Sequence, residues 1–259
     1  MTDMAALADD VAAESAELVS LVEPLPAGDW DRMTPAEGWT ITDQIGHLAY
    51  FDEQAVLAAT DPAAFADHVN EAVLAVVEDV AELHRERGLD GPATLEWFRG
   101  VRRRLVETMR GFDPDQRIPW YGPPMRASSF LVARLMETWA HGTDVADALG
   151  ASLPVTNRLF HIADLGVRTF SWSFNNRQLA VPEERVRVEL VGPDGERRVW
   201  NEEWSQSVTG PVEDFCLVVT QRRHVDDTRL EVDGEVARRW MEIAQAFAGP
   251  PGPGRPPSS

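Results

Sequence analysis

The sequence predicts an α+β protein, with an N-terminal four-helix bundle followed by a small α+β domain. Apolar residues recur at helical spacing in long segments before Gly150, and short alternating strands with turn signals follow that glycine. Long helices with short connections are typical of a bundle, in which sites are built from facing helices. We therefore expect a helical bundle over residues 1–150, a connecting helix and linker over 151–184, a small α+β domain over 185–248 and a disordered tail over 249–259.

The first two predicted helices have clear boundaries. Leucines and valines recur at helical spacing over residues 5–22, and two prolines just beyond that segment end the helix. A turn-rich loop follows. Thr40 or Thr42 can then cap a second helix, over residues 42–58, because a hydroxyl at this position accepts hydrogen bonds from first-turn N–H groups.

Three further helical segments are expected before the end of the bundle. Pro62 lies in the first turn of the next helix, where its missing N–H costs nothing. This helix is expected to extend to about residue 87. The next helix runs over residues 92–110. The last runs over residues 130–149 and is closed by Gly150.

Shorter elements are expected in the second half of the chain. Residues 155–174 favour one more helix. Residues 186–191 alternate between apolar and polar side chains as a strand does, and the turn at residues 192–195 leads into a returning strand over 197–204. The remaining expected elements are a helix over 211–220, a strand over 230–232 and a final helix over 235–247.

Composition and charge exclude several classes of protein. At 259 residues and 44% hydrophobic content, the chain can fold around a substantial core. Lys and Arg total 24 against 43 Asp and Glu, and the formal net charge of -19 repels nucleic acid and anionic lipid. We therefore expect no nucleic-acid partner, no membrane partner, and a monomer or weak homodimer.

The single cysteine, Cys216, excludes an intrachain disulfide and a cysteine-rich zinc motif. Its apolar neighbours favour a buried small side chain rather than a nucleophile. The first residues lack a basic stretch followed by an apolar segment, and no apolar run approaches the length of a membrane span. We expect a cytoplasmic protein without a signal peptide.

A possible metal site is the main functional signal. Glu137 and His141 are four residues apart in a predicted helix, so they lie on one face about 6 Å apart along the axis. Their positions fall in an apolar stripe, which favours side chains that point inward. His47, on its own amphipathic helix, can supply a third ligand. Three protein ligands are typical of a catalytic site with an open position, whereas the alternative is two ordinary helix histidines and a surface contact.

The donor set favours zinc, although iron, nickel and manganese also suit two imidazoles and a carboxylate. Neighbouring carboxylates can orient such imidazoles by accepting a ring N–H. Asp43 lies four residues before His47, and Asp144 lies three residues after His141, so each is a candidate for that role or a plain surface carboxylate.

These segments also resemble a known family. Residues 39–48 (WTITDQIGHL) and 137–144 (ETWAHGTD) are similar to the motifs of the DinB-like metal-binding bundles, and most similar to the mycothiol-dependent maleylpyruvate isomerase branch. The resemblance is strong over residues 1–150 and weaker over 185–248. A glutamate at position 137, where most DinB-like proteins have histidine, favours this branch.

The resemblance implies a zinc ion held by His47, Glu137 and His141, and a sterol-carrier-like C-terminal domain. In that branch the thiol mycothiol adds to the double bond of an unsaturated oxo acid, and is eliminated after rotation. An arginine of the C-terminal domain holds a substrate carboxylate there. Arg222 and Arg223 are the matching candidates, with solvated surface charge as the alternative.

We therefore expect an isomerase or S-transferase that uses a divalent metal and a low-molecular-weight thiol on a small anionic unsaturated substrate. Two alternatives stay open: a thiol-independent metal-dependent hydrolase or lyase, and a non-catalytic metal-containing protein that binds an apolar ligand. Trp120 and Tyr121 can form a wall over the metal or cap the bundle core. The other histidines are expected to be ordinary, except that His224 can approach the site.

Overall fold

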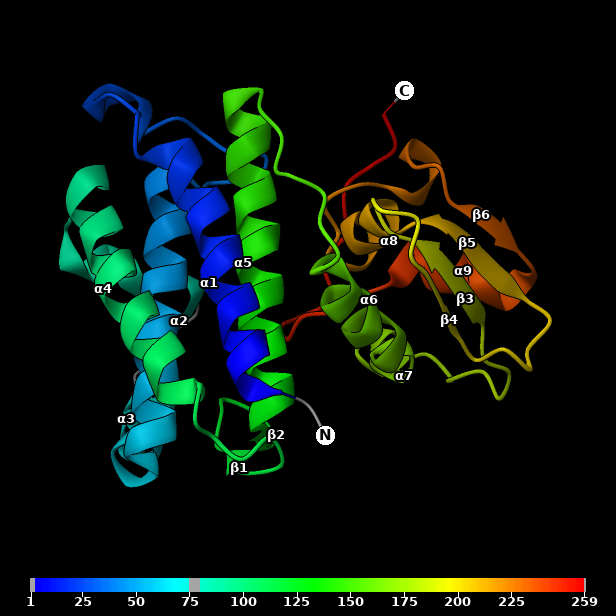
Figure 1. Ribbon diagram of the computed structural model, residues 1–259, viewed down its shortest axis with the longest axis horizontal. Helices are drawn as coiled ribbons and strands as arrows, with labels where there is room; N and C mark the ends of the chain where they lie inside the picture. The colour runs from blue at the N-terminus through cyan, green and yellow to red at the C-terminus, as the bar shows by residue number, and fades with distance from the viewer. Residues whose placement is uncertain (1–2, 75–79, 259) are drawn as a thin grey trace. The chain divides into compact units, whose positions relative to one another are not determined.

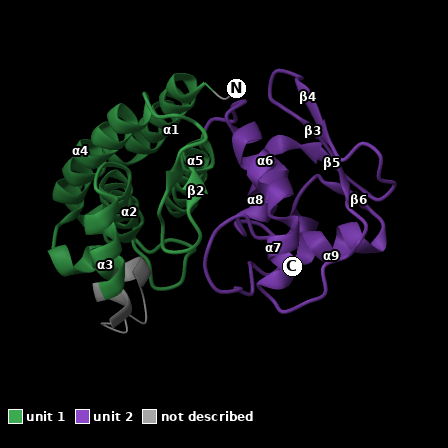
Figure 2. Ribbon diagram, turned by 90° about the horizontal axis from the view of Figure 1, so that it is seen from below, with its two compact units in different colours: residues 1–153 green, residues 154–259 purple. Residues whose placement is uncertain are grey.

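The structure is a computed structural model, and it describes residues 3–74 and 80–258. The chain forms two compact units, residues 1–153 and residues 154–259 (Figure 2). The first unit is dominated by helices and the second combines helices with a sheet, so the predicted α+β class is confirmed. Residues 154–184, expected to connect two domains, belong to the second unit.

Four long helices form the bundle of the first unit (Figure 1): α1 (Met4–Val22), α2 (Ile41–Thr60), α4 (Gly91–Met109) and α5 (Ala127–Leu149). Both α1 and α2 pack on α4 and on α5. The connections contain η1 (Ala27–Asp29), α3 (Pro62–Leu74), η2 (Val80–Arg87), β1 (Arg117–Ile118) and β2 (Met125–Arg126). Fully buried Leu18, Ile45 and Phe98 lie in the core between the helices.

Capping contacts fix both helices that carry the predicted metal ligands. The hydroxyl of Thr40 accepts from the N–H of Asp43, and the Asp43 carboxylate accepts from the N–H of Thr40, which together form a capping box at the start of α2. Thr40 is therefore the cap, rather than Thr42. Gly150 ends α5 in the left-handed region, with φ 65°.

The predicted helix over residues 61–87 is only partly correct. The α-helix α3 is described as far as Leu74, residues 75–79 lie outside the described part of the chain, and η2 is a 3₁₀-helix. His84 and Arg85 of η2 contact the Asp43 carboxylate, at 3.0 and 2.8 Å, so this segment is held against the start of α2.

The second unit contains α6 (Leu159–Arg168), α7 (Phe170–Asn175), β3 (Arg187–Val191), β4 (Arg197–Trp200), β5 (Ser207–Pro211), α8 (Val212–Val219), η3 (Val225–Asp227), β6 (Glu231–Asp233) and α9 (Glu235–Ile243). The strand order is β4-β3-β5-β6, with β3 and β5 parallel and the other pairs antiparallel. Helices gather on one face of this sheet (Figure 2).

Two features of the second unit differ from the sequence prediction. The single helix expected over 155–174 is two helices that meet at Thr169, whose hydroxyl donates back to the carbonyls of Leu165 and Gly166. Strand β5 was not predicted. Residues 249–258 have no helix or strand, and the Ser258 N–H donates to the Asp227 carboxylate. Among the described residues, no helix is long and apolar enough to cross a membrane.

Candidate metal centre

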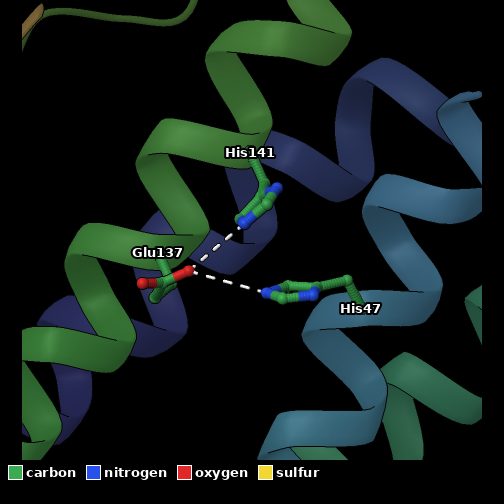
Figure 3. Close-up of side chains that lie close together, drawn as sticks. All are labelled: His47, Glu137 and His141. Atoms are coloured by element: carbon green, nitrogen blue, oxygen red, sulfur yellow. Dashed lines mark hydrogen bonds and ion pairs between the residues drawn. The ribbon is translucent and has the colours of Figure 1, made fainter. Parts of the chain in front are cut away.

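Two helices of the bundle bring the predicted ligands together (Figure 3). His47 comes from α2, and Glu137 and His141 come from successive turns of α5. One Glu137 oxygen, Oε2, lies 3.2 Å from Nε2 of His141 and 3.7 Å from Nε2 of His47. One ligand atom from each residue lies within 4.8 Å of the other two. The three side chains therefore converge on one point.

These distances suit a tetrahedral metal ion. Bonds of about 2.0–2.2 Å to zinc place neighbouring tetrahedral ligand atoms about 3.4 Å apart. Both distances from Glu137 fall close to that value. Two imidazole nitrogens and one carboxylate oxygen are also a donor set that zinc accepts, with a fourth position left for water or another ligand.

The protonation states favour metal binding. Burial, above all, and the neighbouring charge of His141 lower the pKa of His47 to about 4, although Glu137 acts in the opposite direction. His47 is therefore neutral near pH 7. Burial raises the pKa of the Glu137 carboxyl, but hydrogen bonds from His141 and His47 outweigh it and hold that pKa well below its ordinary value. Glu137 is therefore ionised.

A hydrogen-bonded chain orients His141. Nδ1 of its ring meets Oε1 of Gln44, and Nε2 of Gln44 donates to the hydroxyl of Thr34 at 2.8 Å. That hydroxyl donates to the carbonyl oxygen of Trp39 at 3.0 Å. Because Oε1 of Gln44 can only accept, Nδ1 of His141 carries a proton, and Nε2, which faces Glu137, is the ring nitrogen left to bind a metal ion.

Carboxylates were predicted for this orienting role, but the observed partner of Nδ1 of His141 is the side-chain amide of Gln44. Asp43 was the candidate for His47, but its carboxylate contacts Thr40, His84 and Arg85. A signal for Gln44 does exist in the sequence, since it lies three residues before His47 and so shares a helix face with it.

Aromatic rings surround the two histidines. Trp39 stacks on His141 with centroids 5.8 Å apart, and its ring lies 5.2 Å from that of His47. Phe51, one turn after His47, contacts the same imidazole at 4.7 Å. These rings limit the access of water to the ligands, which strengthens electrostatic interactions inside the site.

Trp120 packs on the core of the bundle, and Tyr121 reaches the triad only indirectly among the contacts that the structure describes. Trp120 stacks on Phe65 and meets Phe130 edge-to-face, and both partners are fully buried, so Trp120 caps the core. Tyr121 contacts Phe51, which in turn contacts the imidazole of His47. The Tyr121 hydroxyl also lies 3.1 Å from Nε2 of His68, a histidine for which no functional role was predicted.

The remaining predicted site residues lie in the second unit. Arg222 and Arg223 follow α8 and are half-buried, and a guanidinium nitrogen of each meets a backbone carbonyl at 2.7 Å. Their contact with a substrate stays a prediction, as does the approach of His224. Cys216 is buried, with Sγ 3.3 Å from the carbonyl oxygen of Leu159, as expected for a small core side chain.

Comparisons with known proteins point to one family. Residues 11–146 match the family model described as the mycothiol maleylpyruvate isomerase N-terminal domain. The matched range contains His47, Glu137 and His141. An uncharacterized protein of Mycobacterium tuberculosis, in strains CDC 1551 and H37Rv, is 47% identical over 258 residues, which cover 98% of this chain and 100% of the relative.

Solved structures show the same fold. A crystal structure of the mycothiol-dependent maleylpyruvate isomerase matches this chain with a TM-score of 0.57, covering 85% of this chain and 90% of the isomerase chain. A mutant of that isomerase matches with a TM-score of 0.58 over 87% of this chain and 91% of its own. Sequence identity is 15% in both cases, so the likeness concerns the fold.

Proposed function

This chain belongs to the mycothiol maleylpyruvate isomerase N-terminal domain family, and on that premise we propose that it is a metal- and thiol-dependent isomerase or S-transferase. Its substrate is a small anionic unsaturated molecule. The observation that supports this most is the convergence of His47, Glu137 and His141 on one point of the bundle. Zinc is the proposed ion, and mycothiol, named in the family description, is the proposed thiol.

Each residue of the triad has a separate part in this proposal. Glu137 supplies the negative charge, and neutral His47 supplies a nitrogen lone pair. His141 is held in one orientation by Gln44, so its Nε2 needs no rearrangement to bind. A divalent ion held by these residues would lower the pKa of a bound water or thiol.

The thiol must come from outside the chain. The only cysteine, Cys216, is buried and its Sγ meets a backbone carbonyl. In the proposed reaction the sulfur adds to one alkene carbon, and the π electrons move to the conjugated oxo group. The resulting single bond rotates, the C–S bond breaks, and the thiol leaves with the double bond restored. No external oxidant or reductant is needed.

Arg222 and Arg223 are proposed to hold the carboxylate of the substrate, as an arginine of the C-terminal domain does in the resembling branch. A planar guanidinium donates two parallel hydrogen bonds to a carboxylate, which fixes its orientation as well as its position. Both side chains are half-buried rather than fully solvated, which supports this role.

Elemental analysis of the purified protein tests the metal. We expect close to one divalent ion per chain, lost in His141→Ala and retained in the control His161→Ala on α6. Full retention of metal in His141→Ala contradicts the triad.

Cobalt substitution then tests the thiol. Mycothiol added to the cobalt protein should produce the absorbance change expected when sulfur becomes a ligand. If metal binds and this change is absent, a hydrolase or lyase that uses bound water is favoured. Measured affinity for apolar ligands without any turnover favours a binding protein.

A further inference from the structure

A buried ion cluster lies beside the metal triad. Asp52 of α2 is fully buried and accepts from two arginines, each 4% exposed. Nε of Arg102 lies 2.5 Å from one carboxylate oxygen of Asp52, and Nε of Arg134 lies 3.2 Å from the other. Two guanidiniums therefore share one carboxylate inside the bundle.

The two arginines differ in how their other nitrogens are used. Nη1 of Arg102 donates to the hydroxyls of Ser15 and Thr138, both at 2.7 Å, so this side chain links α4 to α1, to α5 and, through Asp52, to α2. The side chain of Arg134 donates only through Nε, among the residues that the structure describes. In that part of the chain, Nη2 of Arg134 and Nη2 of Arg102 are both buried without a hydrogen-bond partner. The difference is that Arg102 makes three side-chain hydrogen bonds through its other nitrogens and Arg134 makes one. Buried donors in native proteins are almost always satisfied, by protein, water or a ligand.

Arg134 lies next to the proposed metal ligands. It precedes Glu137 by three residues on α5, and Asp52 follows His47 by five residues on α2. At about 1.5 Å of rise per residue, the contact between Asp52 and Arg134 lies about 5–8 Å from the metal triad along the bundle. The charge of Arg134 also lowers the pKa values of both Glu137 and His47.

The charges in this part of the bundle favour a bound anion over a water molecule. Asp52 can neutralise only one of the two guanidiniums, and Glu137 only part of the charge of a divalent ion. A buried charge without a counter-charge is costly, and a neutral water would satisfy the free nitrogen without providing one.

We propose that Arg134 is a carboxylate-binding residue of the metal centre, which holds an acidic group of the substrate beside the open coordination position. This inference rests on the proposed function, and it locates part of the substrate recognition within the bundle itself. Arg102 is a structural cation, since its contacts lie within the bundle core.

Titration with fumarate, a small unsaturated dicarboxylate, tests this assignment by calorimetry on the metal-loaded protein. We expect Arg134→Gln to weaken fumarate binding roughly ten- to hundredfold, the usual effect of losing a hydrogen bond to a charged group. Arg134→Lys retains a cation beside Asp52 but not the planar fork, so its affinity should be intermediate. Arg134→Lys also tests the assignment if Arg134→Gln does not fold.

The matched control is Arg102→Gln, which removes the other guanidinium from the same carboxylate. It should lower stability and leave fumarate affinity nearly unchanged. Equal losses in the two glutamine variants would show that Arg134 is merely structural, and undiminished binding in Arg134→Gln and Arg134→Lys would overturn the proposal. Absence of fumarate binding by the unmodified protein at millimolar concentrations would overturn it as well.

The proposed function fails separately, because metal content and the response of the cobalt protein to thiol do not depend on this titration. If the metal or the thiol response is absent but fumarate binding still depends on Arg134, the anion site is supported and the proposed function is contradicted. If the metal and the thiol response are present but Arg134 has no effect on fumarate binding, only the role of Arg134 is contradicted.

Discussion

Gln44 accepts a hydrogen bond from the Nδ1 of His141, across the interface between α2 and α5. Because the Gln44 amide also donates to Thr34, its oxygen is held toward the imidazole. The contact places a proton on Nδ1 of His141 and fixes the direction in which Nε2 points. Gln44, which is not one of the three converging residues, thus decides how the imidazole of His141 is oriented.

Replacing Gln44 by leucine should weaken metal binding roughly ten- to hundredfold, the usual range for partners that orient a metal-bound histidine. Competition with a chromogenic chelator measures this affinity. Gln54→Leu is the matched control, because Gln54 is buried on the same helix and has no part in the triad. An unchanged affinity in Gln44→Leu would show that His141 does not need this partner.

The convergence of His47, Glu137 and His141 was predictable because its signals are local. Glu137 and His141 share one helix face by spacing alone, and the Thr40 cap fixes the start of the helix that bears His47. The resemblance then linked the two motifs across about 90 residues of chain. Their convergence in the structure agrees with that pairing.

Contacts between distant residues could not be predicted in the same way. Asp52 and Arg102 lie 50 positions apart, and each resembles an ordinary charged helix residue in the sequence. Strand β5 was missed because Ser207–Pro211 has one large apolar residue, Val208, and contains both glycine and proline. Pairing with β3 on one side and β6 on the other makes it a strand, and the sequence of the segment alone does not encode those partners.

Removing the carboxylate of Asp52 should destabilise the protein by about 3–5 kcal/mol, because it leaves two buried guanidiniums without their shared partner. Urea unfolding of Asp52→Ala measures the change. Asp9→Ala is the control, since Asp9 pairs with Arg110 on the surface and both side chains are largely exposed, at 63% and 44%. We expect no measurable change there. Similar stability in both variants would contradict the importance given to the buried cluster.

Acid should destabilise the protein partly through Asp43. Burial raises the pKa of this carboxyl, but hydrogen bonds from His84, Arg85 and Thr40 outweigh burial and hold the pKa far below its ordinary value. As the pH falls, the unfolded chain therefore takes up this proton first. The carboxylate stabilises the fold above about pH 4, and that contribution is lost progressively as the pH falls below it.

Urea midpoints measured between about pH 4 and pH 2 should consequently fall less steeply in Asp43→Asn than in the unmodified protein. Asp90→Asn provides the comparison, because Asp90 also caps a helix but is exposed, and its carboxylate accepts from the N–H of Ala93 alone among the residues described. If Asp43→Asn and the unmodified protein lose stability equally over this range, the contacts of Asp43 do not control acid sensitivity.

Arg222 and Arg223 provide the last prediction. The turn that bears them is sharp, with Gln221 at φ 60°, and each guanidinium meets a carbonyl oxygen that limits its rotation. A side chain held in this way loses less entropy when it binds a carboxylate. Replacing the arginine that contacts the substrate by alanine should therefore lower kcat/KM roughly ten- to hundredfold, which corresponds to about 1.5–3 kcal/mol.

Metal content should stay unchanged in Arg222→Ala and Arg223→Ala, which separates a substrate contact from damage to the triad. Lysine at the same position should restore only part of the activity, because a point charge cannot donate two parallel hydrogen bonds. Arg238→Ala, at an exposed position of α9, should leave kcat/KM unaltered. If neither alanine variant changes turnover while Arg134→Gln does, the bundle alone recognises the acidic group, and the second unit has a role other than holding the substrate.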